Sequence, residues 1–118
     1  MSPSSAKKIL LVEDEVMVAM MLEDIICDLG HEVVGPAYNV AAGLALAQSA
    51  QLDIAILDVN LGDGDSSPIG DALAARNIPF ILATGYGSTA SNAHSVPVLQ
   101  KPYLSSDIEQ ALYNISAA

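Results

Sequence analysis

The chain has few of the residues that several classes of protein require. It contains one cysteine, Cys27, so it cannot form an internal disulfide, and one cysteine with two histidines does not make a zinc site. We expect Cys27 to be a small packing group. No apolar run approaches the roughly 20 residues that cross a bilayer. The N-terminal stretch MSPSSAKKILLVEDE turns acidic where a secretory signal would continue apolar. These absences favour a cytoplasmic protein.

Basic residues are also scarce. Four lysines and arginines stand against 14 acids, which gives a formal net charge of −10. A protein with this charge is repelled by phosphate backbones and by anionic lipid. We therefore expect no direct nucleic-acid partner and no membrane partner.

What the sequence does contain is core material for one domain. The 118 residues are 52% hydrophobic, which predicts a single domain, residues 1–118, with its core at about 7–116. Short apolar runs alternate with helical patterns. The predicted strands are 7–13, 31–38, 52–58, 78–84 and 96–100. Five buried strands that alternate with helices indicate an α/β fold, a doubly wound parallel sheet with helices on both faces.

The polar residues gather where these strands end. Glu13 and Asp14 follow the first strand, and Asp58 ends the third. Such ends meet at one edge of a parallel sheet, where carboxylates repel one another and a divalent cation relieves the repulsion. Oxygen donors suit Mg²⁺, with Asp14 and Asp58 as direct ligands. A solvated helix start is the alternative reading of consecutive acids.

A metal-bound carboxylate can also be a nucleophile towards phosphorus. Asp58 would form an aspartyl phosphate if cations neutralise the charge on the transferred oxygens. Lys101, at the end of the fifth strand, can pair with a phosphoryl oxygen, and Pro102 would fix the backbone that aims it. The Thr84 hydroxyl, at the end of the fourth strand, can donate to another oxygen, although for Thr84 taken alone a structural hydroxyl is the better reading.

The stretches ILLVEDE, ILDVNL, AT and KP, in this order and spacing, resemble the receiver domain of two-component response regulators. The resemblance covers about residues 7–116. It implies a flavodoxin-like sheet of five strands in the order 2-1-3-4-5. It also implies that Asp58 accepts a phosphoryl group from a histidine kinase or a histidine phosphotransfer protein. The implied site residues are the acidic pair Glu13 and Asp14, the backbone carbonyl of Asn60 on Mg²⁺, the switch hydroxyl of Thr84, and Lys101, with Glu13 contributing through water.

The sequence departs from that family at several positions. Val98 stands where the family usually has an aromatic switch residue, and Gly62 where it commonly has proline. The stretches DVNLGDGDSSP and PFILATGYG look like the divergent subgroup nicknamed FAT GUY, although Leu82 replaces its phenylalanine. This resemblance implies that the segment after the threonine is a loop more than a full helix, which agrees with the small, polar composition of residues 85–95. We expect Tyr86, with Gly85 and Gly87 as a hinge, to report phosphorylation in place of the missing aromatic.

Two predictions concern the surface. Met17 and Met20 fall off the main apolar face of the helix that begins at Val16. With Val16 and Ala19 they form a candidate docking patch for a helical partner near Asp58. His31 and His94 lie in predicted turns, and we expect both at the surface.

The resulting prediction is a stand-alone receiver, a phosphorylation-dependent switch that acts on a downstream protein and exists as a monomer or weak dimer. It would not be a turnover enzyme. One competing hypothesis is an interaction module that keeps the fold and works without phosphorylation, which Val98 makes conceivable. Another is an aspartyl-nucleophile phosphohydrolase, because DVN is similar to an Asp-x-Asp motif. That motif's second acid is missing here, and the chain has no room for a cap domain.

Overall fold

The structure, a computed structural model, describes residues 6–59, 61, 64, 66–84, 98–100 and 105–117, and strands and helices alternate in it up to residue 84. The predicted hinge, Gly85, Tyr86 and Gly87, and the loop around His94 lie outside these residues. The elements, in chain order, are β1 (Lys8–Val12), α1 (Val16–Asp28), β2 (Glu32–Ala37), α2 (Val40–Ser49), β3 (Ile54–Asp58), α3 (Ser67–Ala75), β4 (Phe80–Thr84), β5 (Val98–Gln100) and α4 (Ser105–Ala117).

All the strands run parallel in one sheet. Their order is β2-β1-β3-β4-β5, so β3 lies between β1 and β4. The strand β3 is buried along its whole length, which explains why its sequence, IAILD, is apolar at four of its five positions. The predicted α/β class with a parallel sheet is confirmed. Because the strands are parallel, their carboxyl ends lie at the same edge of the sheet.

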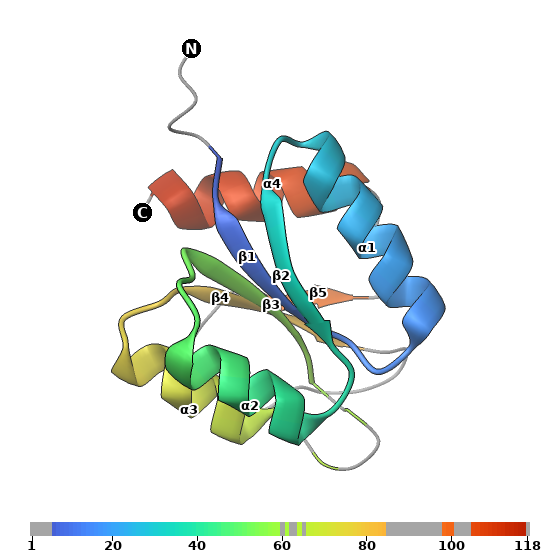
Figure 1. Ribbon diagram of the computed structural model, residues 1–118. Helices are drawn as coiled ribbons and strands as arrows, with labels where there is room; N and C mark the ends of the chain where they lie inside the picture. The colour runs from blue at the N-terminus through green and yellow to red at the C-terminus, as the bar shows by residue number, and fades with distance from the viewer. Residues whose placement is uncertain are drawn as a thin grey trace.

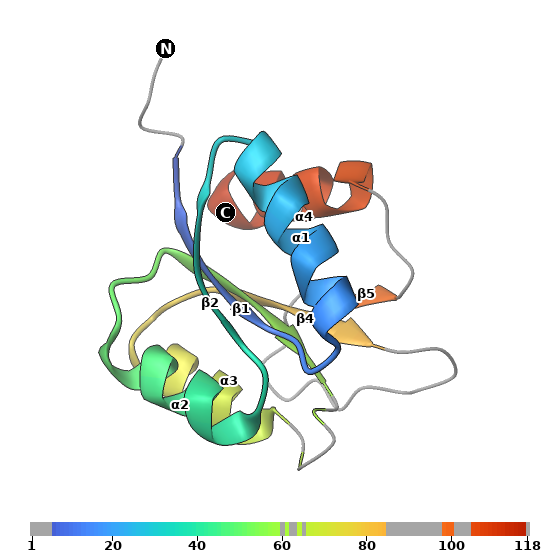
Figure 2. The same cartoon turned by 45° about the vertical axis from the view of Figure 1, so that its right-hand side comes forward.

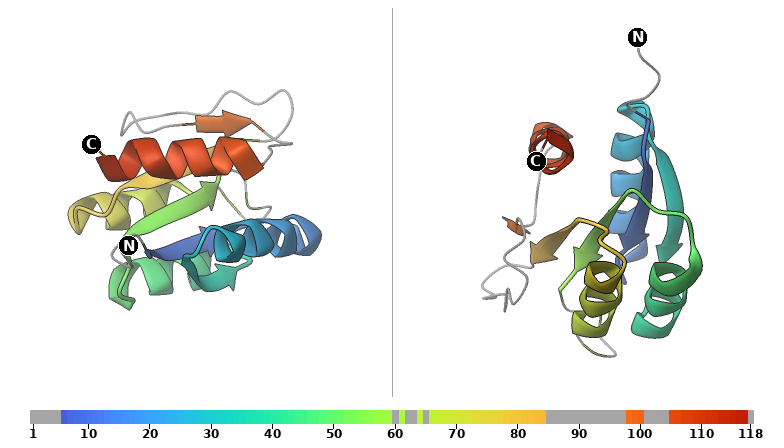
Figure 3. Two further views of the ribbon diagram at one scale, coloured as in Figure 1. Left: turned by 90° about the horizontal axis from the view of Figure 1, so that it is seen from above. Right: turned by 90° about the vertical axis from the view of Figure 1, so that its left-hand side faces the viewer.

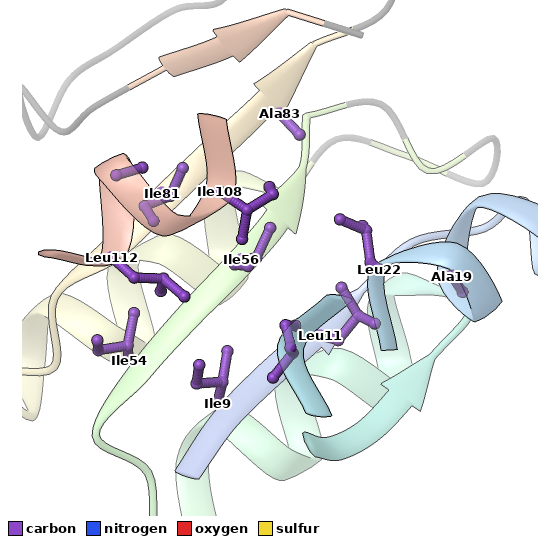
Figure 4. Close-up of a cluster of buried hydrophobic side chains, with 12 residues drawn as sticks. Ile9, Leu11, Ala19, Leu22, Ile54, Ile56, Ile81, Ala83, Ile108 and Leu112 are labelled. Carbon is purple, nitrogen blue, oxygen red and sulfur yellow. The ribbon is translucent and has the colours of Figure 1, made fainter. Parts of the chain in front are cut away.

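Helices cover both faces of the sheet, so the core has two separate halves. One half lies between the sheet and the helices α1 and α4, and Figure 4 shows its side chains pointing from the strands towards these helices. The other half lies under α2 and α3, which run side by side in Figures 1 and 3. Alternate residues of each strand enter opposite halves, as Leu10 and Leu11 do. Among the described residues, no helix has the length and apolar character needed to span a membrane.

The helix α1 has the apolar face that its sequence predicts, with one correction. Leu22 and Ile26 are fully buried. Ala19 is also fully buried, in the core half that Figure 4 draws, so its placement in an exposed docking patch is wrong. At 100° per residue, Ala19 points to the same side as Leu22 and Ile26. Gly30 follows the helix with φ +89, a conformation that glycine adopts without strain and that commonly ends helices.

The helices α2 and α3 pack closely on the other face. The side chain of Asn39 accepts a hydrogen bond from Ala42 N at 2.8 Å and so caps α2, as its sequence predicts. Gly43 allows the close approach, because a Cβ at this position would lie 2.8 Å from Ile69 Cδ1. Arg76, just after α3, donates from Nη1 to Ala47 O at 2.6 Å and from Nη2 to Ala50 O at 2.8 Å. It thus satisfies carbonyls at the end of α2.

Candidate functional site

Three carboxylates meet at the carboxyl edge of the sheet. In the β1–β3 ladder Val12 lies opposite Leu57, so Glu13 and Asp14, which follow Val12, reach the level of Asp58. One carboxylate oxygen from each of these three acids lies within 4.8 Å of the other two. The structure therefore brings together the acids that the sequence placed at separate strand ends.

The backbone holds Glu13 in place. Its N–H donates to Ala37 O of the neighbouring β2 at 2.9 Å. Its side chain reaches forward along the chain, where Oε2 accepts a hydrogen bond from Glu15 N at 3.1 Å. Glu15 is also the residue before α1, and its carbonyl accepts the N–H of Ala19. The turn from β1 into α1 thus fixes the carboxylate as part of the helix start.

Burial strengthens the electrostatic repulsion among the acids of this cluster. Glu13 is 1% exposed and Asp58 is 5% exposed, and Asp14 is half-buried. Ionised carboxylates this close together repel more strongly when protein replaces water around them. Hard oxygen donors in a small cluster fit Mg²⁺, which binds through one or two carboxylates and keeps several waters. Asp14 and Asp58 would hold the cation, with Glu13 close by.

The loop after Asp58 is tied to both neighbouring elements. Val59 N–H donates to Ala83 O of β4 at 2.9 Å, and Val59 O accepts from Ser66 N at 3.1 Å, at the start of α3. Leu61 N–H donates to Gly64 O at 2.9 Å, and its side chain is 2% exposed. Because this loop is polar in composition, the sequence did not predict a core residue in it. The apolar side chain of Leu61 was the one signal that could have done so.

The fourth and fifth strands end beside the acids. Asp58 lies opposite Ala83 in the β3–β4 ladder, and the next residue, Thr84, lies opposite Gln100 in the β4–β5 ladder. Lys101 follows Gln100 directly in the sequence. The backbone register therefore brings the ends of β3, β4 and β5 to one edge. Val98 begins β5, opposite Leu82.

Several predicted site residues lie outside the part of the chain that the structure describes. They are Asn60, Gly85, Tyr86, Gly87, Lys101 and Pro102. Their roles, and that of the Thr84 hydroxyl, stay predictions.

The predicted docking patch changes its membership. Val16, Met17 and Met20 are exposed at 53%, 83% and 58%, as expected, and Met21 is exposed as well. Ala19 is replaced by Met21 in this set, which we call the α1 patch: Val16, Met17, Met20 and Met21. Figure 2 shows the start of α1 directly after the carboxyl end of β1, so the α1 patch begins beside the acidic cluster.

A partly buried histidine lies at the opposite end of the sheet, where the strands begin. His31, predicted to lie at the surface, is half-buried, and its Nδ1 accepts a hydrogen bond from Lys7 N at 3.0 Å. Burial, and then the charge of Lys7, lower the pKa of His31 below its ordinary value. Cys27, expected to be a packing group, is exposed, because it lies away from the apolar face of α1.

Known proteins resemble the chain along nearly all of its length. The family model described as "Response regulator receiver domain" matches residues 9–113. The phyllosphere-induced regulator PhyR of Methylorubrum extorquens is 31% identical over 118 residues, covering 92% of this chain and 44% of that protein. The transcriptional regulatory protein PdtaR of Mycobacterium tuberculosis is 27% identical over 90% of this chain and 55% of its own length. The chain thus spans about half the length of these curated relatives.

A solved structure matches from end to end. SdrG from Sphingomonas melonis Fr1 shares 44% identity and superimposes with a TM-score of 0.84, covering 98% of this chain and 99% of that chain.

Proposed function

Because this chain belongs to the response regulator receiver family, we propose that Asp58 accepts a phosphoryl group from the phosphohistidine of a histidine kinase or histidine phosphotransfer protein. The observation that carries this proposal is the convergence of Glu13, Asp14 and Asp58 at one edge of the sheet. The Asp58 carboxylate lies at the end of a rigid, buried strand, which suits a nucleophile that must be held in place.

The phosphoryl transfer forms one bond and breaks one bond. An oxygen of Asp58 attacks the donor's phosphorus, the P–O bond forms as the P–N bond breaks, and the electron pair of that bond stays on the imidazole nitrogen. Mg²⁺ bound by Asp14 and Asp58 would neutralise charge on the transferred oxygens. The Glu15 N–H holds the Glu13 side chain, so that its carboxylate would stay beside the cation.

The end of the sheet supplies the remaining groups. Thr84 ends β4 one residue after Ala83, which lies opposite Asp58, and Lys101 follows Gln100, the last residue of β5, in the sequence. We assign the Thr84 hydroxyl and the Lys101 ammonium to phosphoryl oxygens, with Pro102 fixing the backbone of Lys101 and the carbonyl of Asn60 on the cation. Added charge at Asp58 would then draw these groups inward and change the surface that a downstream protein meets.

A protein phosphodonor must cover the surface around Asp58 to deliver its histidine. The α1 patch adjoins that surface, and α1 carries acids and no base, so the matching partner surface would be apolar with basic residues at its rim. A charge placed in the patch, as in Met17→Glu, would slow transfer from a phosphotransfer protein and spare transfer from a small donor. Equal slowing of both would argue against docking.

The decisive experiment is phosphorylation by acetyl phosphate with MgCl₂, followed by intact mass. We expect a gain of one phosphoryl group, lost in Asp58→Asn and lost when EDTA removes the cation. The matched control is Asp53→Asn, since Asp53 is an acid before β3 that lies at the far edge of the sheet.

Two other outcomes would point elsewhere. An unphosphorylated wild-type protein that still binds a protein partner would favour the phosphorylation-independent module. Steady release of phosphate from a phosphate ester would indicate a hydrolase instead of a switch that is modified once per cycle.

A further inference from the structure

The loop that leaves Asp58 is polar, yet one of its side chains belongs to the core. After Val59 the chain reads NLGDGDSS, in which Leu61 is the single large apolar residue. Leu61 exposes 2% of its surface and lies in the core half under α2 and α3. Removing a leucine side chain from water favours one fixed position of the backbone that carries it. Leu61 therefore anchors this loop to the α2 and α3 face.

The anchor works together with backbone bonds on either side. Val59 is held by Ala83 O at 2.9 Å and by Ser66 N at 3.1 Å, and the Leu61 N–H is held by Gly64 O at 2.9 Å. The first of these bonds leads to β4 and the second to the start of α3. Val59 and Leu61 are thus attached to β4, to the start of α3 and to the core half under α2 and α3, in which Leu61 is buried and Val59 packs as a partly buried side chain.

We infer that Leu61 is a positioning residue for the acidic site: its buried side chain fixes the loop after Asp58 and so holds the site in the arrangement that binds Mg²⁺. This inference rests on the proposed function, since it concerns the same cation. Without the anchor, the loop must become ordered when the cation binds, and the lost conformational entropy weakens binding. Groups that orient metal ligands from outside typically change affinity 10- to 100-fold when they are removed.

The test compares two leucines of the same core half. Leu61→Ala and Leu73→Ala make the same chemical change, and Leu73 is fully buried on α3, away from the loop. Mg²⁺ affinity is measured by calorimetric titration of each folded variant, with folding checked by circular dichroism. We expect roughly tenfold or greater weakening in Leu61→Ala, little change in Leu73→Ala, and affinity near wild type in Leu61→Met.

A second reading uses the reaction itself. The Mg²⁺ concentration that half-saturates phosphorylation by acetyl phosphate should rise in Leu61→Ala by the same factor, while the rate at saturating Mg²⁺ stays closer to wild type. Where Leu61→Ala does not fold, Leu61→Val against Leu73→Val carries the comparison, with a smaller weakening expected for Leu61→Val alone.

Two results overturn the inference. Mg²⁺ affinity that is equal in wild type and Leu61→Ala means that the anchor does not reach the site. Equal weakening in the Leu61 and Leu73 variants means a general loss of stability. A wild-type protein that neither binds Mg²⁺ nor becomes phosphorylated would instead refute the proposed function, and the inference with it.

Discussion

Glu13 and His31 are titratable side chains that each accept a hydrogen bond from a backbone N–H, at opposite edges of the same sheet. At Glu13 the bond comes from the start of α1 and orients a charge beside Asp58. At His31 the bond comes from Lys7 and requires a neutral Nδ1, because a protonated imidazole has no acceptor nitrogen. One contact thus orients an acid of the proposed cation site, and the other disfavours a positive charge.

The His31 contact predicts a pH dependence of stability. Folding lowers the pKa of His31 below 6.5, through burial first and the Lys7 charge second. Between the lowered pKa and 6.5 the unfolded chain binds more protons, so this group's contribution is complete above pH 6.5 and is lost as pH falls towards the folded pKa. We expect the stability difference between wild type and His31→Gln to be larger at pH 8 than at pH 5.5, measured by urea unfolding.

The comparison with the variant removes the effect of the many acids, which titrate in both proteins. A difference that stays constant with pH, or grows on acidification, would show that His31 does not titrate as its contact with Lys7 requires.

At the scale of elements, the end of α2 is capped by the side chain of the residue that follows α3. The Arg76 guanidinium bonds two carbonyls, Ala47 O and Ala50 O, that α2 itself leaves without helical N–H partners. A planar guanidinium can reach both at once, and its charge also suits the negative end of the helix dipole. Arg76 therefore joins α3 to α2 at the end opposite Asn39.

We expect Arg76→Gln to lower the free energy of unfolding by about 1 kcal/mol. The matched control is Lys8→Gln, which removes the same charge from an acidic protein and loses one exposed side-chain bond, to Gln51 at 3.1 Å. Urea unfolding measures the free energy of unfolding of both variants. Equal losses in the two would mean that the effect comes from the net charge and not from the end of α2.

The whole molecule carries a net charge of −10, and three of its acids are crowded into one cluster. A cation bound there stabilises the folded state by mass action, about 1.4 kcal/mol at ten times its dissociation constant. For a domain of this size that corresponds to a rise of about 4 to 6 °C in melting temperature. We expect millimolar MgCl₂ to produce such a rise, followed by differential scanning fluorimetry.

Salt screening is the effect to separate from this one. NaCl at matched ionic strength should raise the melting temperature less, and Asp14→Asn should reduce the Mg²⁺ response. Equal responses to both salts would mean that the charge is screened generally and not bound at the cluster.

The sequence predicts the part of this architecture that follows from local pattern. Apolar runs identify the strands, and parallel strands place Glu13, Asp14 and Asp58 at one edge without knowledge of any side-chain contact. The prediction for Ala19 is wrong because its small side chain gives a weak hydrophobic signal, whereas its angle around α1, on the side of Leu22, decides its burial.

The contacts that the sequence did not predict join residues far apart along the chain. His31 and Lys7 are 24 residues apart, and Arg76 and Ala47 are 29 apart. Leu61 is buried because its side chain lies in the core half under α2 and α3, which its glycine-rich neighbourhood does not predict. Local pattern predicts the helices and strands and the edge of the sheet where the acids lie. Tertiary packing decides which residues hold the site in place.

The two halves of the core differ in how the chain supplies them. The helices α2 and α3 are separated in sequence by β3 alone, whereas α1 and α4 come from opposite ends of the described chain and lie on the same face (Figure 3). During synthesis the first of these faces can be covered early. On the second face α1 can cover its part early, whereas the part that Ile108 and Leu112 cover stays exposed until α4 leaves the ribosome. A nascent chain halted before α4 would therefore expose an apolar surface of the sheet to chaperones.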